Sequence, residues 1–285
     1  MKILVTGANG QLGSEINIIS SHYNFEWIFL DRKSFDLSDL NNINIKLNRI
    51  KPNVIINCAA YTSVNDAEDD FESANIINHM SVNLIAKWCN FNNCKLLHIS
   101  TDYVYDGSSK IPICEDSPTN PINNYGKTKL LGDLTCLKYN PSSIIIRTSW
   151  LYSSFGNNFV KKMIFLMHEN KELDVINDQI GSPTYAADLS ELVISIIINK
   201  QWRPGIYNYT NNAKISWYDL ANDIKGIYGF NTTINGVSSK KYSGIAKRPK
   251  YSLLDKTKIK TTFNITLIPY KDSLKKCIKI LKNET

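Results

Sequence analysis

The sequence predicts an α/β protein whose core is a doubly wound parallel sheet, with a smaller carboxyl-terminal lobe. Through the first half of the chain, short apolar runs rich in β-branched residues alternate with stretches of helical periodicity. This is the pattern of parallel strands joined by helical crossovers. A glycine-rich turn follows the first apolar run at Gly7, and after Trp150 the alternation loosens. We therefore expect the second half to build the lobe.

Each expected element has a local signal. Continuous apolar character suits strands buried on both faces, and such runs cover residues 3–5, 26–31, 53–57, 95–100, 143–147 and 173–176. Helical periodicity covers residues 11–20, 72–91, 185–199, a stretch from about 216, and 269–282. A further helix should begin after Pro121, capped by Asn123 or Asn124, and should carry Tyr125.

The turn after the first strand has the features of a nucleotide-binding site. Gly7, Gly10 and Gly13 lie between a strand and a helix, where the backbone can approach a pyrophosphate and the helix amino terminus offers N–H groups to it. Asp31 ends the next strand, where an acid can bind the adenosine ribose hydroxyls. Asp31 would repel a 2′-phosphate and Arg32 would attract one. NAD(H) and NADP(H) therefore both stay open, and dual use is expected.

This turn sets the expected domain organisation, a Rossmann-like sheet followed by a substrate lobe. Residues 1–150 are expected to form the dinucleotide-binding domain, and residues 151–285 mainly the substrate-binding lobe. A strand and a helix at about 173–199 should return to the sheet. Residues 205–209 and the basic segment that follows are assigned to the lobe.

Composition excludes several classes of protein. The 285 residues are 43% hydrophobic, which is enough for a packed core. The apolar run 192–198 is far shorter than the roughly 20 residues that span a membrane. Because Met1 leads almost directly into Gly7, no signal peptide is expected and the predicted location is cytoplasmic. Six cysteines without a Cys-x-x-Cys pair are expected to stay reduced and to bind no metal.

Three polar residues suggest hydride-transfer chemistry. Tyr125 and Lys129 are four residues apart and so share one helix face. Lys129 is expected to lower the pKa of Tyr125 and make it a proton shuttle. Thr101 follows the strand at 95–100, at the sheet edge where open α/β folds bind ligands. Its hydroxyl is expected to hold a substrate carbonyl.

The positive charge is concentrated in one segment. The formal net charge is +7, and between Ser238 and Lys260 basic residues face the single acid Asp255. Such a segment suits a nucleic acid, a diphosphate ligand or merely a solvated face. Arg248 beside Pro249 is the best candidate for a bidentate phosphate partner, and no nucleic-acid module is apparent. We therefore expect a diphosphate ligand and no nucleic acid.

These motifs, in this order, resemble the extended short-chain dehydrogenase/reductase superfamily, and within it most closely the dTDP-4-dehydrorhamnose reductase family. The matching segments are 6–13, 57–62, 100–105, 125–129, 147–150, 156–159, 177–184 and 248–249. The resemblance implies hydride transfer from NAD(P)H to the 4-keto group of a nucleoside-diphosphate 6-deoxy-4-keto sugar. The expected conversion is dTDP-4-dehydro-L-rhamnose to dTDP-L-rhamnose.

The resemblance also implies roles for individual residues. The catalytic residues would be Thr101, Tyr125 and Lys129, and the sugar nucleotide would face Asp102, Tyr103 and Trp150. Together with Asn9 of the turn and Arg32, the implied cofactor-lining set is Gly7, Gly10, Gln11, Leu12, Asp31, Asp36, Leu37, Ala59, Ala60, Thr62, Tyr125 and Lys129.

Departures from the family pattern bear on metal and assembly. Some dimeric members hold a bridging magnesium through glutamates. Glu15 matches one of these glutamates, but Ala187 stands where another would align. A magnesium-linked dimer is therefore doubtful, Glu15 is expected to be a helix-surface acid, and monomer and homodimer both stay open.

Two competing functions are kept. A sugar-nucleotide epimerase or epimerase-reductase shares this fold, but the reductases that also epimerise use an added Cys and His as acid and base, and residues 100–105 contain no Cys. A non-catalytic NAD(P)-binding regulatory subunit is the other alternative. Retention of Thr101, Tyr125 and Lys129 argues against it.

Overall fold

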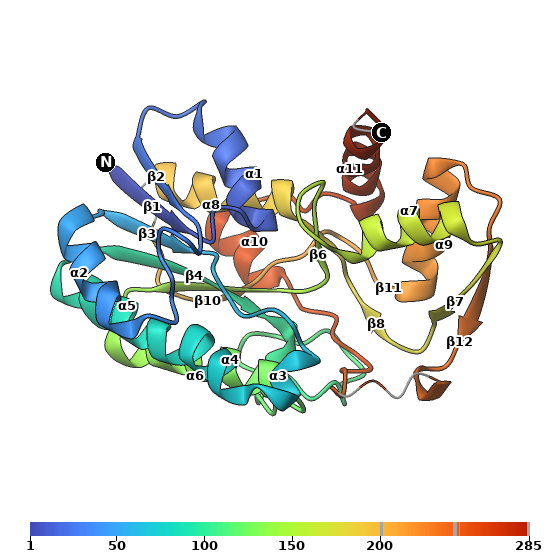
Figure 1. The fold of residues 1–285 in the computed structure, drawn as a ribbon, viewed down its shortest axis with the longest axis horizontal. Coiled ribbons are helices and arrows are strands. Elements are labelled where there is room, and N and C mark those ends of the chain that lie inside the picture. The colour runs from blue at the N-terminus through green and yellow to red at the C-terminus, as the bar shows by residue number, and fades with distance from the viewer. Residues whose placement is uncertain (200–201, 242–243, 245, 284–285) are drawn as a thin grey trace.

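The chain folds into two lobes that lie side by side (Figure 1). The structure is a computed structural model that describes residues 1–199, 202–241, 244 and 246–283. The first lobe is an α/β sandwich around a six-stranded sheet, and the second is a smaller assembly of helices and short strands. This confirms the fold class that the sequence predicts.

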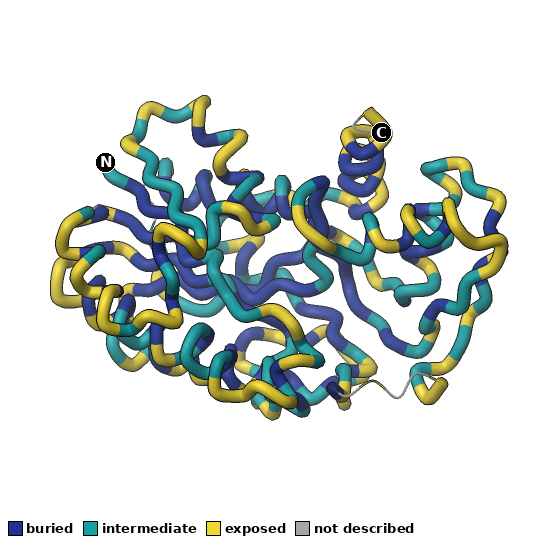
Figure 2. The backbone as a smooth tube through the Cα atoms, in the orientation of Figure 1, coloured by how far each residue is buried: buried dark blue, intermediate teal, exposed yellow. Residues whose placement is uncertain are grey.

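The central sheet is entirely parallel, with strand order β10-β5-β4-β3-β1-β2. Its strands are β1 Lys2–Thr6, β2 Glu26–Leu30, β3 Val54–Asn57, β4 Lys95–Thr101, β5 Ile144–Thr148 and β10 Gly205–Asn208. The inner strands are buried on both faces, as their continuous apolar runs predict (Figure 2). From β1 the chain adds β2 on one side and then β3, β4 and β5 on the other, so the strand order changes direction between β1 and β3. Open α/β sheets bind ligands at the carboxyl ends of the strands beside such a switch point.

Helices cover both faces of this sheet (Figure 1). Apolar side chains from α1 Gln11–Ser20, α8 Ala186–Ile198 and α10 Thr257–Phe263 form one core layer. Those from α2 Leu40–Ile50, α5 Ser81–Phe91 and α6 Asn124–Tyr139 form the other. Asn123 caps α6, since its side chain accepts the Gly126 N–H at 2.7 Å. This is one of the two caps that the sequence proposes.

The helix expected at 72–91 is interrupted. It is built as α4 Phe71–Asn75, the π-turn η1 Ile76–Met80 and α5, with the short α3 Asp66–Asp69 before it. Within the π-turn, the buried Asn78 side chain accepts the Tyr61 N–H at 2.9 Å and donates to the Tyr61 carbonyl at 3.1 Å. π-turns often occur at functional sites. In this chain the π-turn places Asn78 so that its side chain fixes the backbone of the loop after β3 at Tyr61.

The second lobe has its own apolar core. It is built from β6 Leu151–Tyr152, α7 Phe159–Glu169, β7 Glu172–Ile176, β8 Ile180–Gly181, β9 Thr184–Tyr185, β11 Ile215–Ser216, α9 Trp217–Tyr228, β12 Thr233–Val237 and α11 Tyr270–Asn283. Two 3-10 turns complete the described elements. The turn η2 Asp102–Val104 follows β4, and η3 Ser239–Lys241 follows β12. None of the described helices combines the length and the apolar character that crossing a membrane requires.

The strand expected to return to the sheet was misplaced. The helix at 185–199 does return, because α8 packs against the sheet and α1. The strand at 173–176 does not, since β7 pairs with β12 in a separate two-stranded sheet. The edge beside β5 is instead taken by β10, which the sequence analysis assigns to the lobe. Because α8 lies on the sheet, the segment after it is the one delivered to the sheet edge.

Glu15 also departs from expectation. It is a helix residue only 5% exposed, and its Oε1 accepts the Ser153 hydroxyl at 2.6 Å. Burial raises the pKa of this carboxyl, and the nearby Asp188 adds to the effect. Glu15 therefore joins α1 to the loop after β6 and is not the surface acid that the sequence suggests. The second lobe packs over this side of α1.

Candidate active site

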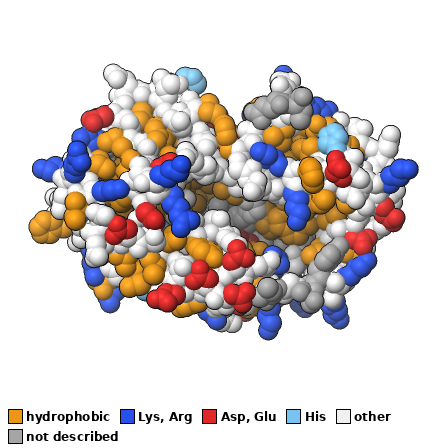
Figure 3. Space-filling model, viewed as in Figure 1, with side chains coloured by type: hydrophobic (Ala, Val, Ile, Leu, Met, Phe, Trp, Pro, Cys, Tyr) orange, Lys and Arg blue, Asp and Glu red, His pale blue; other side chains and the backbone are white. Residues whose placement is uncertain are grey.

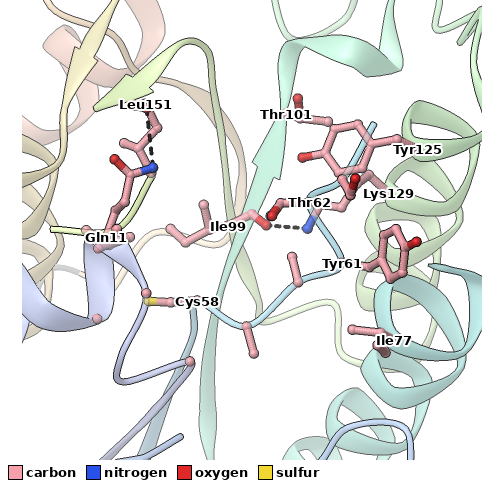
Figure 4. Close-up of a pocket in the computed structure, with 18 of the residues that line it drawn as sticks. Gln11, Cys58, Tyr61, Thr62, Ile77, Ile99, Thr101, Tyr125, Lys129 and Leu151 are labelled. Carbon is pink, nitrogen blue, oxygen red and sulfur yellow. Dashed lines mark hydrogen bonds between the residues drawn. The ribbon is translucent and has the colours of Figure 1, made fainter. Parts of the chain in front are cut away.

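A cavity of about 880 Å³ lies between the lobes, at the carboxyl ends of β1 to β5. Figure 3 shows the surface hollowed at this junction, and Figure 4 shows part of its lining. The first lobe contributes the segments that follow its strands, and the second contributes residues 150–151, 156–157 and Trp217. Every cofactor and substrate residue named from the sequence lines this cavity, except Arg248.

The glycine turn fits a dinucleotide. Gly7 has φ +67°, and a Cβ there would lie 2.8 Å from the Ala59 backbone nitrogen. A Cβ at Gly13 would lie 2.3 Å from the Gly7 carbonyl oxygen. Only glycine permits this close packing of turn, helix and neighbouring loop. The first residues of α1 line the cavity, and no side chain caps the helix at Gly10. Its first N–H groups would thus be free to donate to a pyrophosphate there.

The residues after β2 surround the expected ribose position. Asp31 accepts Asn9 Nδ2 on Oδ2 at 2.9 Å and the Ser34 hydroxyl on Oδ1 at 2.7 Å. The hydrogen bonds from Ser34 lower the pKa of Asp31, so the carboxylate is charged at neutral pH. Arg32 is exposed and lines the same cavity, as do Asp36 and Leu37. An acid and a cation therefore lie together at this part of the cavity, where the sequence predicts the adenosine ribose.

Tyr125, Lys129 and Thr101 meet in this cavity (Figure 4). Thr101 ends β4, and its hydroxyl accepts the Tyr103 N–H at 3.2 Å while donating to Asp102 Oδ1 at 3.1 Å. Burial raises the pKa of Tyr125, and a hydrogen bond with Thr101 partly opposes the rise. The phenol therefore keeps its proton at neutral pH, which suits a proton donor.

Lys129 is held against β4. Its Nζ donates to the Ile99 carbonyl at 2.6 Å (Figure 4). The same Nζ lies 3.4 Å from His98 Nε2. Burial lowers the pKa of Lys129 to about 8, although Asp133 opposes that shift. The lowering of the Tyr125 pKa by Lys129 stays a prediction: the amine bonds to β4 in this arrangement, and burial makes the net shift of the phenol pKa upward.

Asp102 and Tyr103 line the cavity beyond Thr101. Asp102 is 2% exposed, and burial raises its pKa to about 7. Tyr103 packs edge-on against Tyr125, with ring centroids 5.7 Å apart. Burial raises the pKa of Tyr103 to about 12. This part of the wall thus holds its acidic groups in or near their neutral forms.

An aromatic pair forms the wall on the side of the second lobe. Trp150 stacks on Trp217 with centroids 3.6 Å apart and an interplanar angle of 14°. Trp150 has φ +48°, a left-handed conformation that is strained for a large side chain. A Cβ on Gly181 would lie 2.8 Å from the Trp150 indole, so glycine is required there. Trp150 is predicted from the sequence, but Trp217 is not. The one sequence feature of Trp217 is that an aromatic residue follows the Ser216 helix cap.

Gln11 connects the two lobes beside the glycine turn. Its Nε2 lies 3.4 Å from the Leu151 carbonyl (Figure 4), and its Oε1 accepts Asn158 Nδ2 at 3.0 Å. Sequence reasoning places Gln11 only among cofactor-lining residues. In the structure its side chain also hydrogen-bonds residues of the second lobe. Gln11 therefore lies between the glycine turn and the second lobe.

Arg248 lies outside the cavity lining. Its guanidinium donates to Asn65 Oδ1 at 3.2 Å and hydrogen-bonds Tyr103. Tyr103 lines the cavity, whereas Arg248 contacts Tyr103 from outside the lining. Within the described part of the chain, no group of three or more His, Cys, Asp or Glu residues could hold a metal ion. Cys58, Cys89, Cys94, Cys114 and Cys136 are free thiols.

Comparisons with known proteins agree with this geometry. A family model described as the RmlD substrate binding domain matches residues 1–283. The chain is 37% identical to a dTDP-4-dehydrorhamnose reductase of Aggregatibacter actinomycetemcomitans, over 96% of this chain and 97% of that protein.

Two crystal structures are similar throughout. A dTDP-4-dehydrorhamnose reductase of Clostridium acetobutylicum matches with a TM-score of 0.95 and 40% identity, over 99% of this chain and 100% of that one. A dTDP-4-dehydrorhamnose reductase of Bacillus anthracis in complex with NADP matches with a TM-score of 0.92 and 33% identity, over 97% and 98% of the two chains. The resemblance seen in the motifs is confirmed, and the chain belongs to the RmlD substrate binding domain family.

Proposed function

We propose that this protein reduces the 4-keto group of a nucleoside-diphosphate 6-deoxy-4-keto sugar, converting dTDP-4-dehydro-L-rhamnose to dTDP-L-rhamnose. The observation that carries the proposal is one cavity lined by a glycine turn, a half-buried tyrosine, a buried lysine and an aromatic wall. The full-length relatives named above carry this activity in their names. A bound nicotinamide cofactor supplies the hydride.

The residues of the chain handle the proton. Tyr125 holds its phenolic proton, because burial raises its pKa, and donates it to the alkoxide oxygen that forms from the ketone. Thr101 holds the carbonyl oxygen in line through its hydroxyl, which turns from Asp102 Oδ1 to donate to the substrate. Lys129, when protonated, stabilises the tyrosinate that is left behind. The product gains one C–H and one O–H bond, and Tyr125 is reprotonated from solvent.

The binding residues divide between the lobes. Gly7, Gly10 and the amino terminus of α1 hold the cofactor pyrophosphate, while Asp31 and Arg32 meet the adenosine ribose. NADPH and NADH both serve as reductants in this proposal. Trp150 and Trp217 hold the sugar nucleotide. Arg248 binds its diphosphate after releasing Asn65, a hydrogen bond of 3.2 Å.

A reductase is favoured over an epimerase-reductase. Epimerisation needs an acid and a base beside the ketone, and the cysteine that lines the cavity is Cys58. Burial raises the pKa of Cys58 to about 12, so it stays a thiol and is a poor base. The protein is proposed to act in the cytoplasm, without nucleic acid, as a monomer or a homodimer.

The proposal is tested by following cofactor absorbance with dTDP-, UDP- and GDP-linked 4-keto-6-deoxy sugars. We expect oxidation of NADPH and of NADH with the dTDP-linked sugar, and a product reduced only at carbon 4. Cofactor binding without oxidation by any of these sugars would point instead to a regulatory subunit. A product inverted at a neighbouring carbon would point to an epimerase-reductase.

A further inference from the structure

A buried polar row crosses the apolar layer between the central sheet and α6. Thr6, Asn57 and His98 occupy matching register positions on β1, β3 and β4. All three are at most 1% exposed. Polar groups in such a layer cost free energy unless each one is hydrogen-bonded. The partners of each atom therefore define how the row is oriented.

The hydrogen bonds of the row run in one direction. The Ala59 N–H donates to Thr6 Oγ1 at 3.2 Å, and the Thr6 hydroxyl donates to Asn57 Oδ1 at 2.6 Å. Because Asn57 Oδ1 already accepts from Thr6, it is the amide nitrogen Nδ2 that lies 3.0 Å from His98 Nδ1, and this nitrogen can only donate. Nδ1 must then accept, so the ring proton of a neutral His98 lies on Nε2.

The other end of the row is Lys129. His98 Nε2 lies 3.4 Å from Lys129 Nζ, which donates to the Ile99 carbonyl at 2.6 Å. Gly132 lets α6 approach η1, because a Cβ there would lie 2.3 Å from the Asn78 carbonyl oxygen; the same Cβ would lie at an ordinary contact distance of 3.6 Å from Nε2. The lysine that we assign to the reaction is thus held from behind by a histidine outside the cavity lining.

We propose that His98 is a positioning residue whose neutral ring, oriented through Asn57 and Thr6, fixes the Lys129 amine against the Ile99 carbonyl. An Nε2–H aimed at Nζ bonds well to an uncharged amine and poorly to an ammonium group. His98 therefore keeps the amine in place while the Tyr125 proton goes to the substrate alkoxide, and the proton that charges Lys129 comes from solvent. This role rests on the proposed reduction.

The surrounding charges fit this arrangement. Burial lowers the pKa of Lys129 to about 8, while Asp133 and Cys136 on α6 and Cys58 after β3 oppose the shift. Burial and then Lys129 lower the pKa of His98 well below its usual range, so the ring is neutral. Tyr125 lies one turn before Lys129 on α6, and burial raises its pKa.

The first test reads the histidine directly, without turnover. The chain has four histidines, so nitrogen NMR of labelled side chains in the protein without cofactor resolves each ring. We expect His98 to show a protonated Nε2 and an unprotonated Nδ1 that do not change between about pH 6 and 9. A charged His98 ring, or a proton on Nδ1, would overturn the proposal.

The second test compares two substitutions. His98→Asn keeps a group near Asn57 but does not reach Lys129, whereas His98→Gln does reach it. We expect His98→Asn to lower kcat about tenfold, the scale of one hydrogen bond to an ionisable group, without raising KM for the nucleotide sugar. The alkaline limb of its pH profile should move up by about one pH unit, because the amine regains solvation. His98→Gln should recover most of kcat.

The controls separate this inference from the proposed function. His22 is exposed, and His22→Gln should match the wild type in kcat and pH profile. A His98→Asn enzyme with wild-type kcat, or with its alkaline limb unmoved or lowered, would remove the positioning role while leaving the reductase intact. Absence of activity in the wild type would remove the proposed function, while the NMR result would still report the tautomer. If His98→Asn fails to fold, that same NMR measurement decides.

Discussion

The two walls of the cavity are built in different ways. The first wall comes from loops that leave adjacent parallel strands and from the start of α6. It carries the buried Thr101, Asp102 and Lys129 and the half-buried Tyr125. The second wall comes from the smaller lobe and consists chiefly of the stacked pair Trp150 and Trp217. From this difference we expect proton chemistry to belong to the sheet edge and nucleotide-sugar affinity chiefly to the lobe. The following experiments separate the two.

The largest expected effect is on the first wall. Tyr125→Phe removes the proton donor and keeps the ring, so turnover should fall by about 10²–10⁴ while the cofactor dissociation constant stays unchanged. Steady-state kinetics and a cofactor titration measure both quantities. Tyr61→Phe, another tyrosine of the cavity lining, is the matched control. Near wild-type turnover in Tyr125→Phe would show that the proton comes from elsewhere.

Asp102 should make stability depend on pH. Burial raises its pKa from 3.8 to about 7, so between these values the folded state binds a proton that the unfolded state lacks. The stabilisation is full below about pH 4 and is lost as pH rises through 7, by at most about 4 kcal/mol.

Urea unfolding at several pH values tests this contribution. Asp102→Asn should lack the fall in unfolding free energy between about pH 4 and 7, because an amide does not titrate. The exposed Asp39 supplies the control, since Asp39→Asn should keep the wild-type pH dependence. Parallel curves for wild type and Asp102→Asn would show that the carboxyl is charged when folded.

The second wall should respond in binding. Trp217→Ala removes the stacking partner of Trp150, a contact of 3.6 Å between centroids, so KM for the nucleotide sugar should rise about tenfold. Turnover and cofactor affinity should change little, since the proton-handling residues are on the other wall. Trp217→Phe keeps an aromatic face and should recover most of the affinity. Equal losses in kcat for both variants would mean that the walls are not separable.

The smallest effect should concern the choice of cofactor. Asp31→Ala removes a ribose partner and a negative charge, so preference should shift toward NADPH by several-fold to about tenfold. Arg32→Ala should shift it the other way, because it removes a cation near the same group. Catalytic efficiency with each cofactor, measured in both variants, gives the ratio. Parallel losses with the two cofactors would show that neither side chain reads the ribose.

Much of the first wall could be predicted from the sequence. The glycine turn, Asp31, and the pair Tyr125 and Lys129 depend on spacings within one strand, turn or helix, and the structure brings them together in one cavity. The Asn123 cap is of the same kind. Such features are local, because backbone geometry and helical periodicity act over a few residues.

The remainder depended on packing between distant segments. Strand β10 displaces β7 from the central sheet because α8 returns the chain to that edge, and Glu15 is buried because the loop after β6 covers it. The link from His98 to Lys129 needs both strand register and the approach of α6. The sequence by itself determined the fold class and the residues of the sheet edge. Tertiary structure decided which partners they met, since those contacts join residues far apart in the chain.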